Sequence, residues 1–309
     1  MSPRGLRRAL AACLLAAVAA VISTTAQEQQ LVLRSSATSV AVHVLVESAT
    51  KPAKPVRDLT AKDFVVTDSG VKQEIAAMTT DVLPLDVTVV LDRLEQSEYA
   101  KRIPHPQVVE LESLLNKDDR LRVVAVGSDI EETLPLGPPG RGPAPLPRLK
   151  SDLPALFDGV ATALIRPTPP GRHHLVVAIT EGFDAYSFTG AAALADIAHR
   201  SDAQLNVIVA EGRRLKTRTL ARVMNPLPID DSLGSLVEIA KSTGGDVIAS
   251  YRLTRSIGGP VKHLFDEVRA GYVLYYTPTG ATDRGWHPIE VTIARPGNFE
   301  VRARRGYAN

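Results

Sequence analysis

The middle of the chain contains four short apolar runs, each rich in Val and Ile, at positions 85–91, 121–126, 175–179 and 205–210. Little alternation between apolar and polar residues is visible along them. A strand with one face in water alternates, whereas a strand that is buried on both faces does not. The pattern therefore predicts the central strands of a parallel β-sheet.

Segments with helical spacing of apolar residues lie between these runs, at 108–115, 151–164, 189–200 and 233–242. The second of them opens on Ser151 and Asp152, residue types that cap the N-termini of helices. Strands and helices that alternate in this way over positions 85–270 are typical of a doubly wound, mostly parallel, Rossmann-type α/β sheet.

Both flanks of this region have the pattern of β-strands. Positions 40–47 alternate almost perfectly, and positions 64–67 precede a turn at Asp68, Ser69 and Gly70. Three more strands are predicted at 271–277, 286–294 and 299–304. These are too few to be stable alone. We expect the N- and C-terminal strands to pair into one small β unit, a β-sandwich, with the α/β domain inserted between them.

The N-terminus has the order of a secretory signal peptide. Arg4, Arg7 and Arg8 are followed by an apolar run at 10–22 and by small residues up to Ala26. The run is too short to span a bilayer. A four-residue segment that ends at Cys13 resembles a lipoprotein box, but the apolar run continues beyond that cysteine. We predict cleavage near Ala26, a mature chain without a transmembrane anchor, and a secreted or periplasmic protein. A buried N-terminal helix is the alternative.

These patterns divide the chain into four segments. The signal peptide covers 1–26, the N-terminal strands of the β unit 27–82, the α/β domain 83–270 and the C-terminal strands 271–309.

Composition excludes several classes of function. The 36 Lys and Arg residues nearly balance the 34 Asp and Glu residues, whereas a dedicated nucleic-acid-binding protein has a basic excess. Cys13, the one cysteine of the sequence, lies in the signal segment, so we expect no disulfide or thiol chemistry. Arg302, Arg304 and Arg305 in the last predicted strand favour a charged outer face that blunts a sheet edge.

Motifs of common enzyme classes are missing from the sequence. It contains no H-E-x-x-H, no G-x-S-x-G elbow, no Walker loop and no G-x-G-x-x-G after a strand. His173 and His174 are adjacent in a predicted strand, so their side chains point to opposite faces and do not form a metal-binding pair.

Several segments resemble one family. They are DLTAKDF at 58–64, LDVTVVLD at 85–92, AITEGFD at 178–184, GYVLYYTP at 271–278 and VRARRGY at 301–307. In this order they resemble the bacterial VWFA-related domain family, whose core is similar to von Willebrand factor type A domains. The resemblance covers positions 38–307 and implies the same α/β fold for the central domain.

The resemblance also implies a position for a metal-ion-dependent adhesion site. In such domains an Asp-x-Ser-x-Ser loop, a Thr on a second loop and an Asp on a third hold Mg²⁺. Here Asp92 is kept, Leu94 and Gln96 replace the serines, and Glu181 replaces the third-loop Asp. The threonine position falls at or near Pro154. Mg²⁺ requires a near-octahedral shell of oxygens, so we expect a degenerate site with no metal and no other cofactor.

The loops at the carboxyl ends of the central strands are the candidate binding site. Ligands of open α/β sheets bind there, at the topological switch point. We expect a ligand-binding cleft that is lined by Asp92, Glu95, Gln96, Glu181 and Asp184. The alternative is that these are solvated carboxylates in polar loops.

Together these features favour a secreted, non-enzymatic protein of binding, adhesion or scaffold type. Its expected partner is a protein or a cell-surface ligand, not a nucleic acid. A first alternative is a cation-dependent adhesion module that retains Mg²⁺ at Asp92 and Glu181. A second is a hydrolase that uses these two carboxylates as an acid–base pair, and a third is a purely architectural component of the cell envelope.

Overall fold

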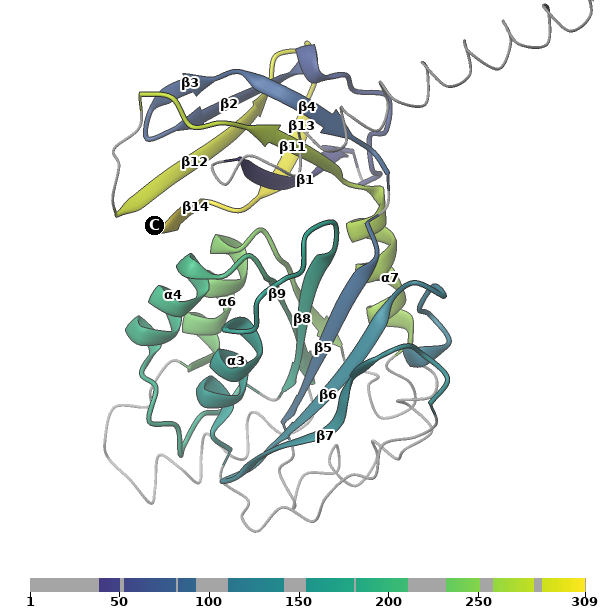
Figure 1. Ribbon diagram of the computed structural model, residues 1–309, viewed down its shortest axis with the longest axis vertical. Coiled ribbons are helices and arrows are strands. Elements are labelled where there is room, and N and C mark those ends of the chain that lie inside the picture. Colours follow the sequence, from purple (N-terminus) through teal and green to yellow (C-terminus); the bar gives the residue numbers. More distant parts are fainter. Residues whose placement is uncertain are drawn as a thin grey trace, which may run out of the picture. The chain divides into compact units, whose positions relative to one another are not determined.

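The computed structural model describes residues 39–50, 53–81, 83–92, 111–141, 154–180, 182–210, 232–250, 258–280 and 285–308 (Figure 1). The predicted signal peptide at 1–26 lies outside these ranges. Within them, no helix is both long enough and apolar enough to cross a membrane.

A six-stranded sheet forms the core of the central domain, in the order β10-β9-β8-β5-β6-β7. The strands are β5 (Leu85–Asp92), β6 (Arg120–Val126), β7 (Ile130–Gly137), β8 (His173–Thr180), β9 (Gln204–Ala210) and β10 (Val247–Ser250). All neighbours are parallel except β7, which pairs antiparallel with β6. The four predicted apolar strands are confirmed as β5, β6, β8 and β9. Every residue of β5 and β8 is buried, as expected for strands covered on both faces.

Helices cover both faces of this sheet (Figure 1). One face packs against α3 (Leu156–Leu164), α4 (Ala191–Arg200) and α6 (Ser232–Ser242), and the other against α7 (Gly258–Ala270). Strand β5 contributes to both layers, with Val89 on the α7 side and Val90 on the α3 side. The predicted doubly wound α/β fold is confirmed. From β5 the chain adds β6 and β7 on one side of the sheet, and from β8 it adds β9 and β10 on the other, so the switch point lies between β5 and β8.

Two of the predicted helices differ in their extent. Helix α3 begins at Leu156, and its N-cap residue is Ala155, whose methyl side chain cannot accept a capping hydrogen bond. Ser151 and Asp152, the predicted capping residues, lie outside the described ranges. Of the segment 108–115, the structure describes helical backbone only at Leu111 and Glu112.

The flanking strands form two four-stranded sheets, with the orders β13-β1-β11-β4 and β14-β12-β2-β3. Their bounds are β1 (Val40–Ser48), β2 (Phe64–Asp68), β3 (Val71–Gln73), β4 (Ile75–Thr79), β11 (Tyr272–Tyr276), β12 (Trp286–Ile293), β13 (Phe299–Ala303) and β14 (Gly306–Ala308). A short 3₁₀ turn, η1 (Ala61–Asp63), precedes β2.

Strands from the two ends of the chain pair with one another in both sheets. β1 pairs antiparallel with β13, β4 with β11, and β2 with β12. The expectation that an α/β domain is inserted between strands of one β unit is therefore confirmed. The exact segment boundaries stay predictions. Ser69 and Gly70 have φ values of 52° and 80°, the positive values that a two-residue type I′ hairpin between β2 and β3 requires.

A buried carboxylate links the two sheets of the β unit. Asp68 of β2 is 0% exposed and accepts hydrogen bonds from the hydroxyls of Tyr276 at 2.8 Å and Tyr307 at 3.0 Å. His287 stacks on Tyr307, with 4.7 Å between ring centroids. Burial, together with the bond to Asp68, raises the pKa of Tyr307 to about 12. Tyr276 lies in the other sheet, so this polar cluster fixes the packing of the two.

The arginines of the last strands contact the α/β domain. Arg302 forms ion pairs with Asp246 and Glu267, and the Arg304 guanidinium donates to the carbonyl of Ser201 at 3.3 Å. The expectation of a merely charged outer face is therefore incomplete. β13 is an edge strand, as the prediction requires. Its Arg302 side chain, however, forms ion pairs with two carboxylates of the α/β domain instead of facing solvent alone.

Candidate functional site

The carboxyl edge of the six-stranded sheet, where its parallel strands end, holds the first predicted site residue. Asp92 is the last residue of β5 and is only 1% exposed. Its Oδ2 accepts a hydrogen bond of 2.6 Å from the hydroxyl of Thr180, the last residue of the neighbouring β8. The Thr180 hydroxyl in turn accepts a bond of 2.8 Å from the backbone N–H of Gly182. A buried carboxylate is thus held between two strand ends.

Glu95, Gln96 and Glu181, three other members of the predicted cleft, lie outside the described residues. Leu94, which stands at a serine position of the implied metal site, lies there too. The expectation that these side chains line a cleft stays a prediction.

Asp184 lies against the start of α3. Its Oδ1 accepts hydrogen bonds from the backbone N–H of Phe157 at 3.1 Å and from the Ser187 hydroxyl at 2.6 Å. The first N–H groups of a helix have no partner within the helix, so Asp184 supplies one from a distant loop. Ser187 does the same for the N–H of Asp158 at 3.0 Å. Burial raises the pKa of Asp184, although these hydrogen bonds oppose the effect.

Pro154, the residue at the implied threonine position, connects three loops of this edge. It is buried, and its carbonyl accepts hydrogen bonds from the backbone N–H groups of Ala185 at 3.0 Å and Tyr186 at 3.2 Å. The next residue, Ala155, donates to the carbonyl of Gly127, directly after β6, at 2.7 Å. Pro154 thus contributes backbone hydrogen bonds where a threonine side chain would offer a hydroxyl.

Comparisons with known proteins find solved structures that are similar to this chain. No family model and no curated protein matches the chain, but solved structures do. An aerotolerance-related membrane protein from Bacteroides fragilis is 18% identical over 60% of this chain and 98% of its own, with a TM-score of 0.40. BatB from Bacteroides thetaiotaomicron is 15% identical over 60% and 97%, with a TM-score of 0.37. A von Willebrand factor type A structure from Catenulispora acidiphila is 10% identical over 77% and 71%, with a TM-score of 0.42.

The strand order decides the fold. Numbered along the domain, the order is the doubly wound 3-2-1-4-5-6, with an antiparallel third strand at the edge. The α/β domain has the fold that the sequence resemblance to von Willebrand factor type A domains implies. Below we name it the VWA-like domain. At these sequence identities the similarity concerns the fold only.

Of the residues at the implied Mg²⁺ position, the structure describes Asp92 and Pro154 but not Leu94, Gln96 or Glu181, so the expectation of a degenerate, metal-free site stays a prediction. Mg²⁺ requires six oxygens at about 2.0–2.1 Å in octahedral geometry. The Thr180 oxygen already donates to Asp92 and accepts from Gly182, and Leu94 has no side-chain oxygen. Within the described ranges, no three His, Cys, Asp or Glu side chains are grouped so that they would hold a metal ion.

Two features of this edge were not predicted from the sequence. Thr180, the hydrogen-bond partner of Asp92, was not a candidate, because only the pairing of β5 with β8 brings the two together. Tyr186 and Phe188 on the loop between β8 and α4 were not candidates either, although they are 55% and 99% exposed. Their signal in the sequence is weak, because aromatic residues are equally common in segments that form the core, and the sequence alone does not show which of them will be exposed.

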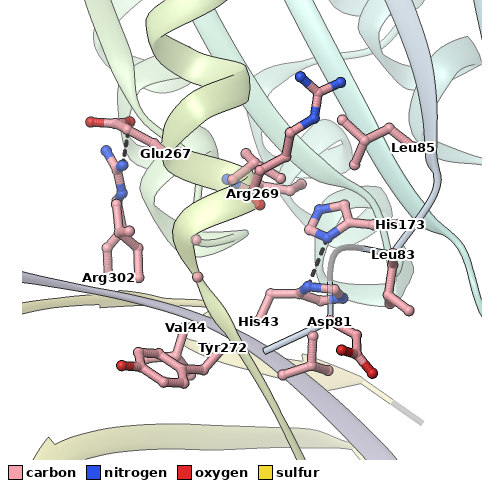
Figure 2. A pocket seen from close by; sticks show the side chains of 16 residues that line it. His43, Val44, Asp81, Leu83, Leu85, His173, Glu267, Arg269, Tyr272 and Arg302 are labelled. Carbon is pink, nitrogen blue, oxygen red and sulfur yellow. Dashed lines mark hydrogen bonds and ion pairs between the residues drawn. The ribbon is translucent and has the colours of Figure 1, made fainter. Parts of the chain in front are cut away.

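The opposite edge of the VWA-like domain borders a small cavity. Figure 2 shows His43 of β1 and His173 of β8 facing one another, with a distance of 2.7 Å between their Nδ1 atoms. The cavity has a volume of about 40 Å³, enough for a few water molecules, since one water needs about 10–15 Å³. It is too small for a metabolite, so we assign it no ligand.

His173 is buried and His43 is half-buried, and this affects their titration. Burial, with the charge of His174 as a second cause, lowers the pKa of His173 from 6.5 to about 4. Burial also lowers the pKa of His43 well below its usual range, and the charges of His173 and Arg304 add to the effect. His174 points to the other face, where its Nε2 lies 3.0 Å from the Thr88 hydroxyl. The expectation that His173 and His174 do not form a pair is consistent with these contacts.

Proposed function

We propose that this chain is an exported, non-enzymatic binding protein, whose VWA-like domain engages a protein or cell-surface partner at the carboxyl edge of its sheet without a metal ion. The observation that carries the proposal is the hydrogen bond of 2.6 Å between Thr180 and Asp92. The carboxylate that begins the adhesion site in von Willebrand A domains is here buried and bonded within the protein.

Independence from metal is supported by the energy that this contact represents. The Thr180 hydroxyl engages Oδ2 of Asp92, and hydrogen bonds to charged groups contribute about 1.5–3 kcal/mol, so a cation that leaves this bond intact would have to bind through Oδ1. Of the two serine positions, Leu94 has no side-chain oxygen, and Gln96 has an amide oxygen in place of a hydroxyl. We therefore propose a degenerate adhesion site and no cofactor.

The lack of exposure at Asp92 supports a binding role over a hydrolase. A general acid or base must lie within hydrogen-bond reach of the proton that it transfers. Asp92 is 1% exposed and bonded to Thr180, so its carboxylate is not presented to a substrate.

Export is supported by the basic, apolar and small-residue order of positions 1–26. N-terminal sequencing of the protein recovered from outside the cytoplasmic membrane tests it. We expect a new N-terminus near Gln27. Recovery of the chain in the cytoplasm with residues 1–26 still attached would contradict export.

Titration calorimetry tests the metal-free proposal. Mg²⁺, Mn²⁺ and Ca²⁺ are each titrated into the full chain, into Asp92→Ala and into Asp196→Asn, a control that removes a carboxylate from the exposed side of α4. We expect no heat that depends on Asp92. Micromolar binding that Asp92→Ala abolishes and Asp196→Asn retains would establish the cation-dependent adhesion module instead.

A binding assay tests the role of the carboxyl edge. Proteins retained from exported fractions by the wild-type chain are compared with those retained by a variant in which positions 93–106, which follow Asp92, are scrambled. We expect selective loss of partners in the variant. Retention of the same partners by both proteins would contradict binding at this edge. It is also the result expected of a purely architectural component.

A further inference from the structure

The loop between β8 and α4, positions 182–190, presents an aromatic side chain wholly to solvent. Phe188 is 99% exposed, and Tyr186 in the same loop is 55% exposed. Burying a Phe side chain is worth about 1.5–3 kcal/mol. A partner that covers the Phe188 ring would gain that stabilisation.

The backbone around Phe188 is held in place by hydrogen bonds. The two carboxylate oxygens of Asp158 accept from the N–H groups of Phe188 at 2.9 Å and Thr189 at 2.8 Å. The N–H of Asp158 donates to the Ser187 hydroxyl at 3.0 Å. These reciprocal contacts join the loop to the first turn of α3. The exposed ring therefore belongs to a pre-formed segment and not to a free loop tip.

Pre-organisation of this kind favours protein recognition. Binding costs less when the loop that carries the contact is already ordered. Aromatic side chains that fill a pocket on the partner supply much of the energy at protein interfaces, and a few such residues dominate. A single ring that stands clear of the surface fits a concave apolar pocket better than a flat one.

The charges around the loop indicate the character of the partner's surface. Between positions 182 and 198 the charged side chains are Asp184 and Asp196, with no Lys or Arg. Asp158 adds a third carboxylate beneath the loop. Complementary charge across an interface guides association and excludes wrong partners. An anionic membrane surface attracts basic segments, not acidic ones.

We propose that Phe188 is the principal contact residue of this protein for its partner, and that it inserts into an apolar pocket with a basic rim on a protein surface. The inference rests on the proposed function, since it names the partner chemistry for the same edge of the sheet. It goes beyond that function in assigning the contact to the β8–α4 loop and not to the Asp92 position.

A random-peptide phage library serves as the probe. Peptides are selected on the immobilised full chain and counter-selected on Phe188→Ser, then synthesised and titrated by fluorescence anisotropy. The matched control is Ile165→Ser, which removes an apolar side chain that is 64% exposed after α3. Because Phe188 is exposed, we expect Phe188→Ser to unfold at the wild-type urea concentration, which shows that the fold is kept.

We expect the selected peptides to combine apolar residues with Lys or Arg. Their Kd should rise at least about tenfold with Phe188→Ser and stay at the wild-type value with Ile165→Ser. Added salt should weaken binding, since screening reduces the attraction between exposed charges.

Two results would overturn the inference. One is a selection that yields no peptide able to distinguish the wild type from Phe188→Ser. If the peptides bind Phe188→Ser as tightly as the wild type but bind the variant scrambled at 93–106 more weakly, the proposed function stands and the Phe188 assignment is wrong. If they bind both variants as tightly as the wild type, both the proposed function and the Phe188 assignment are contradicted. The other is co-sedimentation with vesicles of phosphatidylcholine and phosphatidylglycerol that depends on Phe188, which would assign the ring to a membrane.

Discussion

Acidification should destabilise this protein through the buried His43–His173 contact. One Nδ1 of the pair donates and the other accepts across 2.7 Å, which requires the accepting Nδ1 to carry no proton. A second proton would place two N–H groups against each other in a buried site. His173 is buried, with 4% exposure, and His43 is half-buried. Arg304 faces His43, and the charged residues that line the same cavity are Asp81, Glu267, Arg269 and Arg302.

The sign and size of the effect follow from proton linkage. The unfolded chain protonates His173 near 6.5, while burial in the folded protein lowers its pKa to about 4. Between these values the unfolded state binds the extra proton, so the free energy of unfolding falls as the pH falls. At about 1.4 kcal/mol per pH unit, the loss is about 2 kcal/mol at pH 5. It reaches about 3 kcal/mol below pH 4 and is absent at neutral pH.

Urea unfolding followed by circular dichroism at a series of pH values measures this loss. The test variant is His173→Gln, which keeps a polar side chain and removes the titration. We expect it to be less stable than the wild type at neutral pH but to lose about 2 kcal/mol less on going to pH 5. The control is His263→Gln, since His263 is 64% exposed. It should follow the wild type to within about 0.5 kcal/mol.

Equal pH dependence in the wild type and His173→Gln would refute this reasoning. It would mean that His173 carries its proton in the folded protein near neutral pH, or that water reaches the cavity freely. Other titrating groups, such as Asp184, contribute equally to both proteins and cancel in the difference.

Three further predictions concern single contacts and are measured by urea unfolding at neutral pH. Thr180→Val removes the hydroxyl that donates to Asp92 and should cost about 1–3 kcal/mol, while Thr180→Ser should cost clearly less; equal losses would contradict a role for the hydroxyl. Gly245→Ala would place a Cβ 1.7 Å from the Leu205 carbonyl oxygen and should cost about 3 kcal/mol or more, whereas Gly190→Ala, with open space around it, should fold normally. Tyr276→Phe removes a donor to buried Asp68 and should destabilise the β unit by about 1–3 kcal/mol; a wild-type stability would show that the carboxylate does not need it.

The central strands were predictable from the sequence because burial on both faces leaves a local mark. Val and Ile runs identify β5, β6, β8 and β9 without reference to anything distant in the chain. The edge strands leave no such mark. β7 contains Pro135 and two glutamates, and its residues are mostly not buried, so hydrophobic patterning did not reveal it. β10 spans only Val247–Ser250, too short for a pattern.

Helix ends were less predictable, since their caps come from tertiary neighbours. Ser151 and Asp152 indicated a start at 151, yet α3 begins at Leu156. Two N–H groups of its first turn donate to Asp184 and Ser187. These two residues lie in the loop after β8, the next strand along the chain, so the sequence around position 151 does not reveal them. Helix α7 was missed because Gly258 and Gly259 weaken the helical pattern at its start.

The candidate site divides in the same way. The sequence by itself determined that Asp92 ends a buried strand at the carboxyl edge of a sheet, and that its serine partners are replaced. Only the tertiary structure decided that Thr180 donates to Asp92, that Asp184 caps a helix, and that Phe188 stands in solvent. The reason is physical: periodicity and residue type fix how each segment is buried, but hydrogen bonds between strand ends depend on which strands become neighbours, and that is settled only when the whole sheet assembles.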